Sequence, residues 1–413
     1  MKKLQLILLF VISVFSSLTA QVSQYSSGLQ PMKDGDNEMQ VRNFQKAYDN
    51  YTLAIVADPS LADAYYKRSI VLTKMARYSE ALADQNKALQ LNPNINQLYD
   101  VRGQLRMLVE DFPGAVEDYT KAIENDPSEP ELYNKLAHAH MASGDFDEAL
   151  LDYSRMIKLD PKDTLAYICR ALAYLNLAQF DSAQIDINKA IQLNAQNSLA
   201  VEVQGLIYLE KKELPSSIKA FDQAIKINPQ FALAYYNRGI AWKMLGDAAK
   251  AEADFTRAIE LDQNLSTAFF NRALARKKLG NEDEALEDYN KAIALDKDYA
   301  EAIFFRGLTK KLLGDYEGAL EDFNKSERLN PNDPEIYNNR ANIRMLFGDY
   351  TSAIADYDKA IKLRENYAIA YYNRAVARIM MTKRGLACED FNKSLIFGYE
   401  PARQAVSDFC TTR

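Results

Sequence analysis

Residues 231–263 read FALAYYNRGIAWKMLGDAAKAEADFTRAIELDQ and contain one complete structural unit. Apolar residues recur at helical spacing up to Leu245, the dipeptide Gly246-Asp247 interrupts them, and a second helical run follows. The pattern returns every 34 residues over most of the chain. Its clearest markers are a proline in the closing turn and an alanine in the second run: Pro59, Pro93, Pro127, Pro161, Pro229 and Pro331, and Ala47, Ala81, Ala115, Ala149, Ala183, Ala251, Ala285, Ala319, Ala353 and Ala387. So strict a period predicts a stacked array of one helix-turn-helix unit, and it favours a binding function over an enzymatic one.

The closing proline sets the register of the repeats. Placing it at position 32 predicts an array over residues 28–401, preceded by a linker at 21–27 and followed by a capping helix at 402–413. Gly398 ends one helix and Pro401 begins another that has no partner after it, as the solvent-facing end of an array requires. The units then start at residues 28, 62, 96, 130, 164, 198, 232, 266, 300, 334 and 368.

Three columns of the repeat carry a family resemblance. Position 8 is always small, position 27 is alanine in eight units, and position 24 is aromatic except at Gln85 and Ile187. Small side chains let paired helices approach closely, and an aromatic ring fills the space beside them. These columns resemble the tetratricopeptide repeat family. The resemblance implies an all-α fold, a right-handed α-solenoid of about eleven stacked helix-turn-helix repeats with a C-terminal capping helix.

The resemblance also implies a concave binding groove lined by the first helix of each unit, chiefly at positions 2, 5, 6, 9, 12 and 13. Early units place acidic residues there, whereas units 7 to 9 place an aromatic stripe with amides and amines beside it. Such a surface suits an extended peptide with apolar side chains and some acidic character. The candidate peptide-binding residues are Tyr236, Asn237, Lys243, Phe270, Asn271, Lys277, Lys278, Phe304 and Lys311.

A structural interpretation of this stripe stays open, because an aromatic residue followed by Asn is close to the family's default at positions 5 and 6. One ligand class is disfavoured. The two-carboxylate clamp by which some family members bind chaperone tails requires Lys at position 5 and Asn at position 9 of one unit. Position 5 is never Lys here, and Asn342 is the only Asn at position 9.

Position 7 is Arg and position 23 is Asp in the same eight units, for example Arg238 with Asp254 and Arg272 with Asp288. Both positions are equally distant from the turn at position 15, so an antiparallel helix pair brings them face to face. The spacing predicts structural ion pairs inside the helix pairs. The alternative is a row of arginines that lines the binding groove.

The first twenty residues differ from the rest. Lys2 and Lys3 precede an apolar run from Leu4 to Phe15, and Ala20 closes the segment. This order predicts a bacterial secretory signal peptide at 1–20, and hence export to the periplasm or cell surface, with no membrane span in the mature chain. Leu18 is bulky for a residue just before a cleavage site, so an uncleaved anchor is the alternative.

Composition and motifs disfavour several other classes of protein. The formal charge of −7 and the lack of a long basic block make nucleic acid an unsuitable partner. His138 and His140 are two residues apart on a helix, which is not the spacing of a metal pair. No P-loop, GxGxxG, HExxH or CxxC sequence occurs. We therefore expect neither an enzyme nor a bound metal or cofactor.

The prediction of export bears on the three cysteines. Cys388 lies ten residues before Gly398 and Cys410 twelve after it, so an antiparallel helix pair would bring them together. Behind a secretory signal, this predicts a disulfide between Cys388 and Cys410, and the alternative is two buried thiols. Cys169 would then be the unpaired cysteine.

Two hypotheses about function follow from the sequence. The first is a non-enzymatic scaffold that binds an extended peptide or partner segment in the concave groove, in envelope assembly or secretion. The second is a structural protein that bridges partners, or copies of itself in a homo-oligomer, through its convex face and ends. A hidden enzymatic or glycan-binding site is a third, weaker hypothesis.

Overall fold

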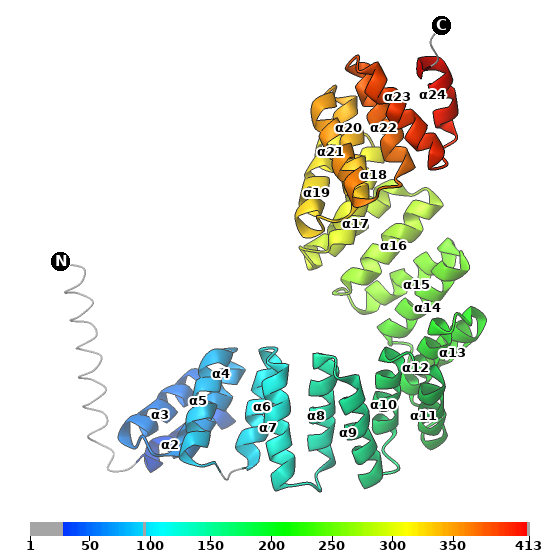
Figure 1. Cartoon of the computed structure of the whole chain (residues 1–413). Coiled ribbons are helices and arrows are strands. Elements are labelled where there is room, and N and C mark those ends of the chain that lie inside the picture. The colour runs from blue at the N-terminus through cyan, green and yellow to red at the C-terminus, as the bar shows by residue number, and fades with distance from the viewer. Residues whose placement is uncertain (1–27, 94–95, 411–413) are drawn as a thin grey trace, which may run out of the picture. The chain divides into compact units, whose positions relative to one another are not determined.

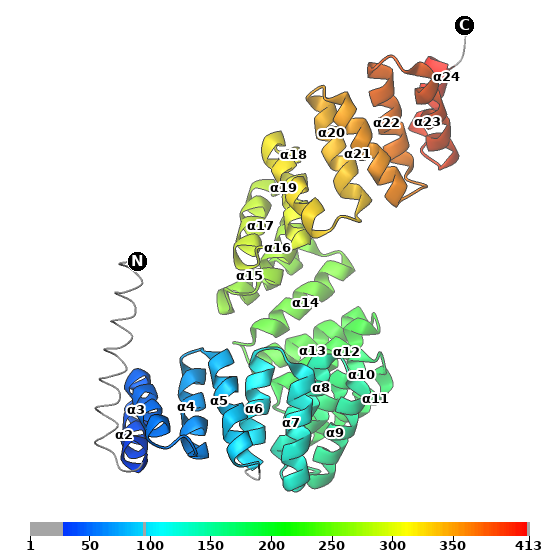
Figure 2. The same cartoon turned by 60° about the vertical axis from the view of Figure 1, so that its left-hand side comes forward.

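A computed structural model describes residues 28–93 and 96–410, and this part of the chain is built from helices (Figures 1 and 2). The predicted signal peptide, the linker and residues 411–413 lie outside the described residues. In chain order the helices are α2 (Leu29–Gln40), α3 (Phe44–Ala57), α4 (Ala62–Lys74), α5 (Tyr78–Leu91), α6 (Asn96–Leu108), α7 (Phe112–Asn125), α8 (Pro130–Ser143), α9 (Phe146–Leu159), α10 (Thr164–Asn176), α11 (Phe180–Leu193), α12 (Ser198–Glu210), α13 (Leu214–Ile227), α14 (Ala232–Leu245), α15 (Ala248–Leu261), α16 (Ser266–Leu279), α17 (Glu282–Leu295), α18 (Ala300–Leu312), α19 (Tyr316–Leu329), α20 (Pro334–Leu346), α21 (Tyr350–Leu363), α22 (Ala368–Met380), α23 (Arg384–Ile396) and α24 (Pro401–Cys410).

The helices stack as pairs to form an α-solenoid. Contacts divide the chain into an N-terminal unit up to Val203 and a C-terminal unit from Gln204. From α2 to α11, and again from α14 to α23, each even-numbered helix packs against the odd-numbered helix that follows it, and that helix packs against the next pair. In the C-terminal unit the first helices also touch one another, α14 with α16, α18 with α20 and α20 with α22. We call the surface formed by these first helices the A face.

Each pair turns at repeat position 15 through a left-handed backbone conformation. Glycine takes this position in the turns after α8, α14, α16, α18 and α20, with φ between 77° and 92°. Six other turns adopt the same conformation without glycine, at Arg42, Ala76, Glu110, Ala178, Lys212 and Thr382. Since a Cβ atom is strained in this region, the repeat geometry overrides the local preference of these residues.

Close helix packing explains the small residue at position 8. A Cβ added to Gly239 would lie 2.7 Å from a ring carbon of Phe255, sixteen residues further along, and Gly35 meets Tyr51 in the same way. Ser69 and Gln85 replace this contact with a hydrogen bond of 2.6 Å from the amide nitrogen to the hydroxyl. The aromatic ring at position 24 therefore packs directly on position 8 of the same helix pair.

The predicted arginine–aspartate pairs are confirmed in all eight repeats. In the pair formed by α16 and α17, Arg272 donates from Nε and Nη2 to both carboxylate oxygens of Asp288, at 2.9 and 2.6 Å. Its remaining nitrogen, Nη1, lies 3.2 Å from the hydroxyl of Thr256 on the preceding pair. Each arginine thus connects residues sixteen positions before and after it. The equivalent pairs are Arg68–Asp84, Arg102–Asp118, Arg170–Asp186, Arg238–Asp254, Arg306–Asp322, Arg340–Asp356 and Arg374–Asp390.

Helix α24 covers the last pair. Ala402 and Ala405 are buried against α23, while Arg403, Gln404 and Asp408 face outward. The structure joins Cys388 of α23 to Cys410 of α24, with Cα atoms 5.5 Å apart, inside the range that a disulfide needs. One apolar face and one polar face suit a helix that ends the stack.

Candidate functional site

The A face of the C-terminal unit carries a row of lysines at repeat position 12. Lys243, Lys277 and Lys311 lie in the last turns of α14, α16 and α18, 34 residues apart. The same position holds Leu209 in the preceding repeat and Met345 in the following one. A positive ladder is therefore confined to three consecutive first helices.

The first lysine of the ladder is held by a polar network. The ammonium of Lys243 donates a 2.6 Å hydrogen bond to Oδ1 of Asn271 on the next first helix. The amide nitrogen of Asn271 donates to the carbonyl of Thr267 and, at 3.2 Å, to the hydroxyl of Tyr236. Asn271 is only 6% exposed, so these bonds satisfy its side chain internally.

The second and third lysines differ in their partners. Lys311 donates a 2.7 Å hydrogen bond to Oδ1 of Asn339, which repeats the Lys243–Asn271 geometry. The residue equivalent to these asparagines for Lys277 is Phe305, and the Lys277 ammonium lies 5.8 Å from the centre of its ring. Within the described residues this ammonium makes no hydrogen bond. The middle position of the ladder thus has a cation–π contact where its neighbours have an amide oxygen.

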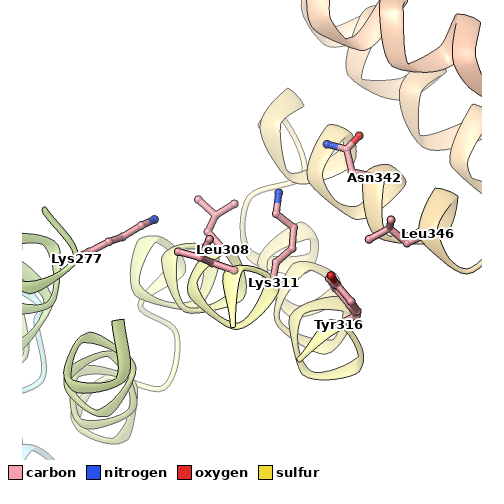
Figure 3. A pocket seen from close by; sticks show the side chains of 7 residues that line it. Lys277, Leu308, Lys311, Tyr316, Asn342 and Leu346 are labelled. Carbon is pink, nitrogen blue, oxygen red and sulfur yellow. The ribbon is translucent and has the colours of Figure 1, made fainter. Parts of the chain in front are cut away.

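Lys277 and Lys311 line a pocket of about 540 Å³ between the A-face helices α16, α18 and α20 (Figure 3). Its other walls are Leu308, Leu312, Tyr316, Asn342 and Leu346, so it has no acidic side chain in its lining. Oδ1 of Asn342 accepts hydrogen bonds from Tyr357 at 2.7 Å and Asn373 at 3.0 Å, which leaves its amide nitrogen turned to the pocket. The polar part of the pocket therefore consists mainly of donors.

Burial makes all three ammonium groups costly to keep charged. Burial lowers the pKa of Lys243, and burial lowers the pKa of Lys277 against the opposing effect of Glu282. The pKa of Lys311 is lowered first by burial and second by repulsion from Lys277. An anion placed between Lys277 and Lys311 would favour the charged form of both lysines and so raise the pKa of each.

The aromatic residues of the predicted stripe differ in burial, since Phe304 is buried whereas Tyr236 and Phe270 are partly exposed. Phe304 packs against Phe305 and Phe323, with ring centres 5.6 and 5.8 Å away, and is 8% exposed. Phe270 contacts Tyr299 at 5.0 Å and belongs to the same kind of cluster. Both rings contribute to packing between repeats, and contact of the partly exposed Phe270 with a ligand stays a prediction.

The predicted binding residues Lys278 and Asn237 lie outside the pocket. Lys278 is exposed and donates to the carbonyl of Gly246, 3.1 Å away in the turn after α14. It therefore points away from its neighbour Lys277, as adjacent residues on a helix do. Asn237 is partly buried on α14 and does not line the pocket. Of the predicted site, the structure brings only Lys277 and Lys311 together in this pocket.

Sequence reasoning did not select five pocket residues: Leu308, Leu312, Tyr316, Asn342 and Leu346. A usable signal was present at position 13, where Leu312, Leu346 and Met380 follow one another at 34-residue spacing. These side chains are 62%, 64% and 55% exposed. Large apolar side chains that are exposed at successive repeats are candidates for contact with a partner.

The N-terminal unit has a different polar pattern. Its acidic groove residue Asp100 is paired with Lys135 at 2.9 Å, and Asp36 is paired with Lys67 at 2.8 Å. His140 lies 2.9 Å from Asp152, in a repeat where Leu136 replaces the usual arginine. The described residues contain no cluster of three potential metal ligands.

Cys169 is a buried thiol, and burial raises its pKa to about 11. It is therefore protonated at neutral pH, which agrees with a small packing residue and not with a nucleophile.

Family comparisons agree with the repeat geometry. A model described as "Tetratricopeptide repeat" matches residues 130–163, 232–265 and 266–299, and a second of the same description matches 62–95 and 166–197. A model described as "TPR repeat" matches residues 103–144, 205–246, 307–346 and 341–381. The chain belongs to the tetratricopeptide repeat family. Repeats of this TPR family generally mediate protein–protein interactions, so a protein partner is implied.

Similarity to a solved structure supports the same fold. A tetratricopeptide repeat protein from Parabacteroides merdae ATCC 43184 matches with a TM-score of 0.52 at 19% identity, over 60% of this TPR chain and 98% of that one. The Cut9–Hcn1 hetero-tetramer of the APC/C gives 0.46 at 14% identity, over 94% and 98% of the two chains. MamA gives 0.35 at 24% identity, over 40% and 97%. No curated protein matches the sequence.

None of the described helices combines the length and the apolar character that a membrane crossing needs.

Proposed function

We propose that this TPR protein is a non-enzymatic scaffold that holds an extended segment of a partner protein against the A face of its C-terminal unit. The pocket between Lys277 and Leu346 carries the proposal. It lies across three successive first helices, its polar groups are donors, and its rims are exposed leucines. A segment laid across the repeats would cover these leucines and meet the donors.

The proposed setting is the envelope of a bacterium, in assembly or secretion. Two observations support export: the basic and apolar order of residues 1–20, and a Cys388–Cys410 pair whose geometry suits a disulfide. A scaffold needs no catalytic group, and the described residues offer a binding surface of ordinary helix side chains.

The test is a crosslinked pull-down of the mature chain from the envelope fraction of its own cells. A Leu312→Ser/Leu346→Ser variant removes the apolar rims without touching the core. Leu279→Ser is the matched control, because this leucine is also exposed at the end of a first helix but lies outside the pocket. We expect a defined partner with wild type and control, and loss of that partner with the double variant.

Equal capture by all three proteins would contradict the proposal and favour bridging through the convex face or the ends. Thermal unfolding of each variant checks that loss of capture is not loss of folding. A triple alanine variant of Tyr236, Phe270 and Phe304 would be a poor test, because these rings pack against neighbouring aromatic residues.

A further inference from the structure

The pocket contains a hydrogen-bond donor without an acceptor, and this indicates the kind of segment that fits it. Lys277 has no hydrogen-bond acceptor among the described residues, since Phe305 occupies the place of Asn271 and Asn339. A partly dehydrated ammonium without an acceptor is costly. This gap in an otherwise regular ladder points to an acceptor that arrives with a partner.

A second ammonium and an amide line the same pocket as Lys277. Lys311 keeps two of its three protons beyond the bond to Asn339, and the amide nitrogen of Asn342 is turned to the pocket. No aspartate or glutamate lines the pocket to neutralise these groups. Three donors around one opening suit a group with two acceptor oxygens and a negative charge.

The surroundings of the donors favour a carboxylate over a phosphate. The pocket has no arginine fork, one of its ammonium groups is partly used by Asn339, and most of its other walls are leucine. A doubly charged phosphate among so few donors would be poorly compensated, whereas one carboxylate balances the pair of lysines.

The rims define what must flank that carboxylate. Leu312 and Leu346 are 62% and 64% exposed on successive first helices, and Leu308 and Tyr316 complete the apolar wall. First helices flank the pocket on both sides, with α14 against α16 and α22 against α20, so a bound segment has A-face helices beside it in both directions. An internal segment fits this arrangement.

We infer that the pocket binds an internal aspartate or glutamate of a partner segment, with its carboxylate between Lys277 and Lys311 and an adjacent aliphatic side chain on Leu312 and Leu346. The inference rests on the proposed function and adds the chemistry of the partner. It assigns the binding charge to position 12 and the apolar contact to position 13.

Peptide display tests it with a probe of known composition. The library consists of random twelve-residue segments held at both ends in a carrier protein, so that no free terminus is available. Selections are run with the wild-type mature chain, with Lys277→Gln/Lys311→Gln and with Leu312→Ser/Leu346→Ser. Lys278→Gln is the matched control, because this neighbouring lysine bonds to Gly246 outside the pocket.

We expect the wild type and the Lys278→Gln control to enrich segments with Asp or Glu next to Leu, Ile, Val or Met. The strongest segment should bind at least tenfold more weakly when its acid is changed to the amide, and at least tenfold more weakly to Lys277→Gln/Lys311→Gln. Added salt should weaken the wild-type interaction and have less effect on the lysine variant.

Two other outcomes are distinguishable. Segments without an acidic residue that bind the lysine variant unchanged, yet lose binding to Leu312→Ser/Leu346→Ser, would overturn this inference and leave the proposed function standing. If no selected segment depends on either pair of residues, both are overturned. Thermal unfolding of every variant confirms that the comparison is made between folded proteins.

Discussion

Arg272 holds both carboxylate oxygens of Asp288 across one helix pair and also reaches Thr256 on the preceding pair. Asp288 is almost fully buried, and Arg276 donates to it as well. A buried carboxylate that loses a partner keeps its desolvation cost. Arg272 therefore stabilises the fold chiefly because it offsets the desolvation cost of Asp288. This role is structural and does not involve a ligand.

Replacing Arg272 by Leu should lower the free energy of unfolding by about 3 kcal/mol, as expected when one partner of a buried ion pair is removed. Urea unfolding of the variant measures the loss. Lys121→Ala breaks the exposed Lys121–Glu124 pair and serves as the control, with an expected change much smaller than that of Arg272→Leu. Equal effects of the two substitutions would show that burial does not set the strength of these pairs.

The hydroxyl of Tyr289 is buried and makes no hydrogen bond to any described residue. Phenylalanine occupies the same repeat position at Phe255 and Phe323. We expect Tyr289→Phe to raise the free energy of unfolding by about 1 kcal/mol, because it removes an unsatisfied polar group without changing the shape of the ring. A fall in thermal stability would indicate a hydrogen bond from this hydroxyl to a buried water.

The same variant should alter the response to alkaline pH. Burial is the main cause that raises the pKa of Tyr289 above its usual value of 10.0. The stability of the wild type should thus be independent of this group below pH 10.0 and fall as pH rises from 10.0 toward the folded-state pKa, because the unfolded state then releases its proton first. Urea unfolding at pH 9 and pH 11 should show a smaller loss for Tyr289→Phe than for the wild type.

Thr382 has a φ of 61° in the turn after α22, a conformation that a β-branched residue rarely adopts. Glycine occupies the equivalent turn at Gly348. Thr382→Gly should stabilise the last repeats by about 1 kcal/mol, since relief of the backbone strain exceeds the extra entropy of the unfolded chain. Ala178→Gly provides a second case in the N-terminal unit, and its gain should be similar.

Lys277→Met should raise stability at neutral pH by about 1 kcal/mol while it weakens binding of acidic segments. The lowered pKa of Lys277 means that the unfolded state binds the proton more readily, so the wild type gains stability as pH approaches 10.5. The difference between the two proteins should therefore narrow at high pH, which parallel unfolding curves at pH 7 and pH 10 would measure.

Cys388→Ser/Cys410→Ser should destabilise the docking of α24 by about 3 kcal/mol in the chain-entropy description of a short closed loop. The readout is the urea midpoint of the C-terminal repeats with and without a reductant. Reduction should lower the midpoint of the wild type and leave the double variant unchanged. Cys169→Ala is the control, because it removes the free thiol and keeps the disulfide. Reduction should lower its midpoint as much as that of the wild type.

The repeat period predicted most of the fold because each column has one physical cause. The first helices from Ala62 onward begin at the residues where the proline register starts each repeat, and the Arg272–Asp288 relation follows from equal distances to the turn. Helix α2 runs for twelve residues although it contains Pro31 and Gly35. Its Gly35 faces the Tyr51 ring like the small residue of any other repeat.

The candidate site was less predictable, since side-chain direction depends on the neighbouring helix. The sequence could not show that Phe304 turns into the core, or that Lys278 turns to Gly246 while Lys277 stays in the pocket. Asn342 was noted only for a clamp that this chain lacks. Its relevant property is an amide oriented by Tyr357 and Asn373, from helices that only packing brings together.

The arginine that reaches sixteen residues in both directions also determines how opening can spread along the stack. Where it is present, one pair cannot separate from its neighbour without breaking the arginine's hydrogen bond to the preceding pair, so we expect the two to exchange their amide hydrogens together. Leu136 removes that tie at α8, because a leucine cannot reach Thr120 or Asp152 with a hydrogen bond. The helices α2 to α7 should accordingly exchange as one block, with α8 as its border.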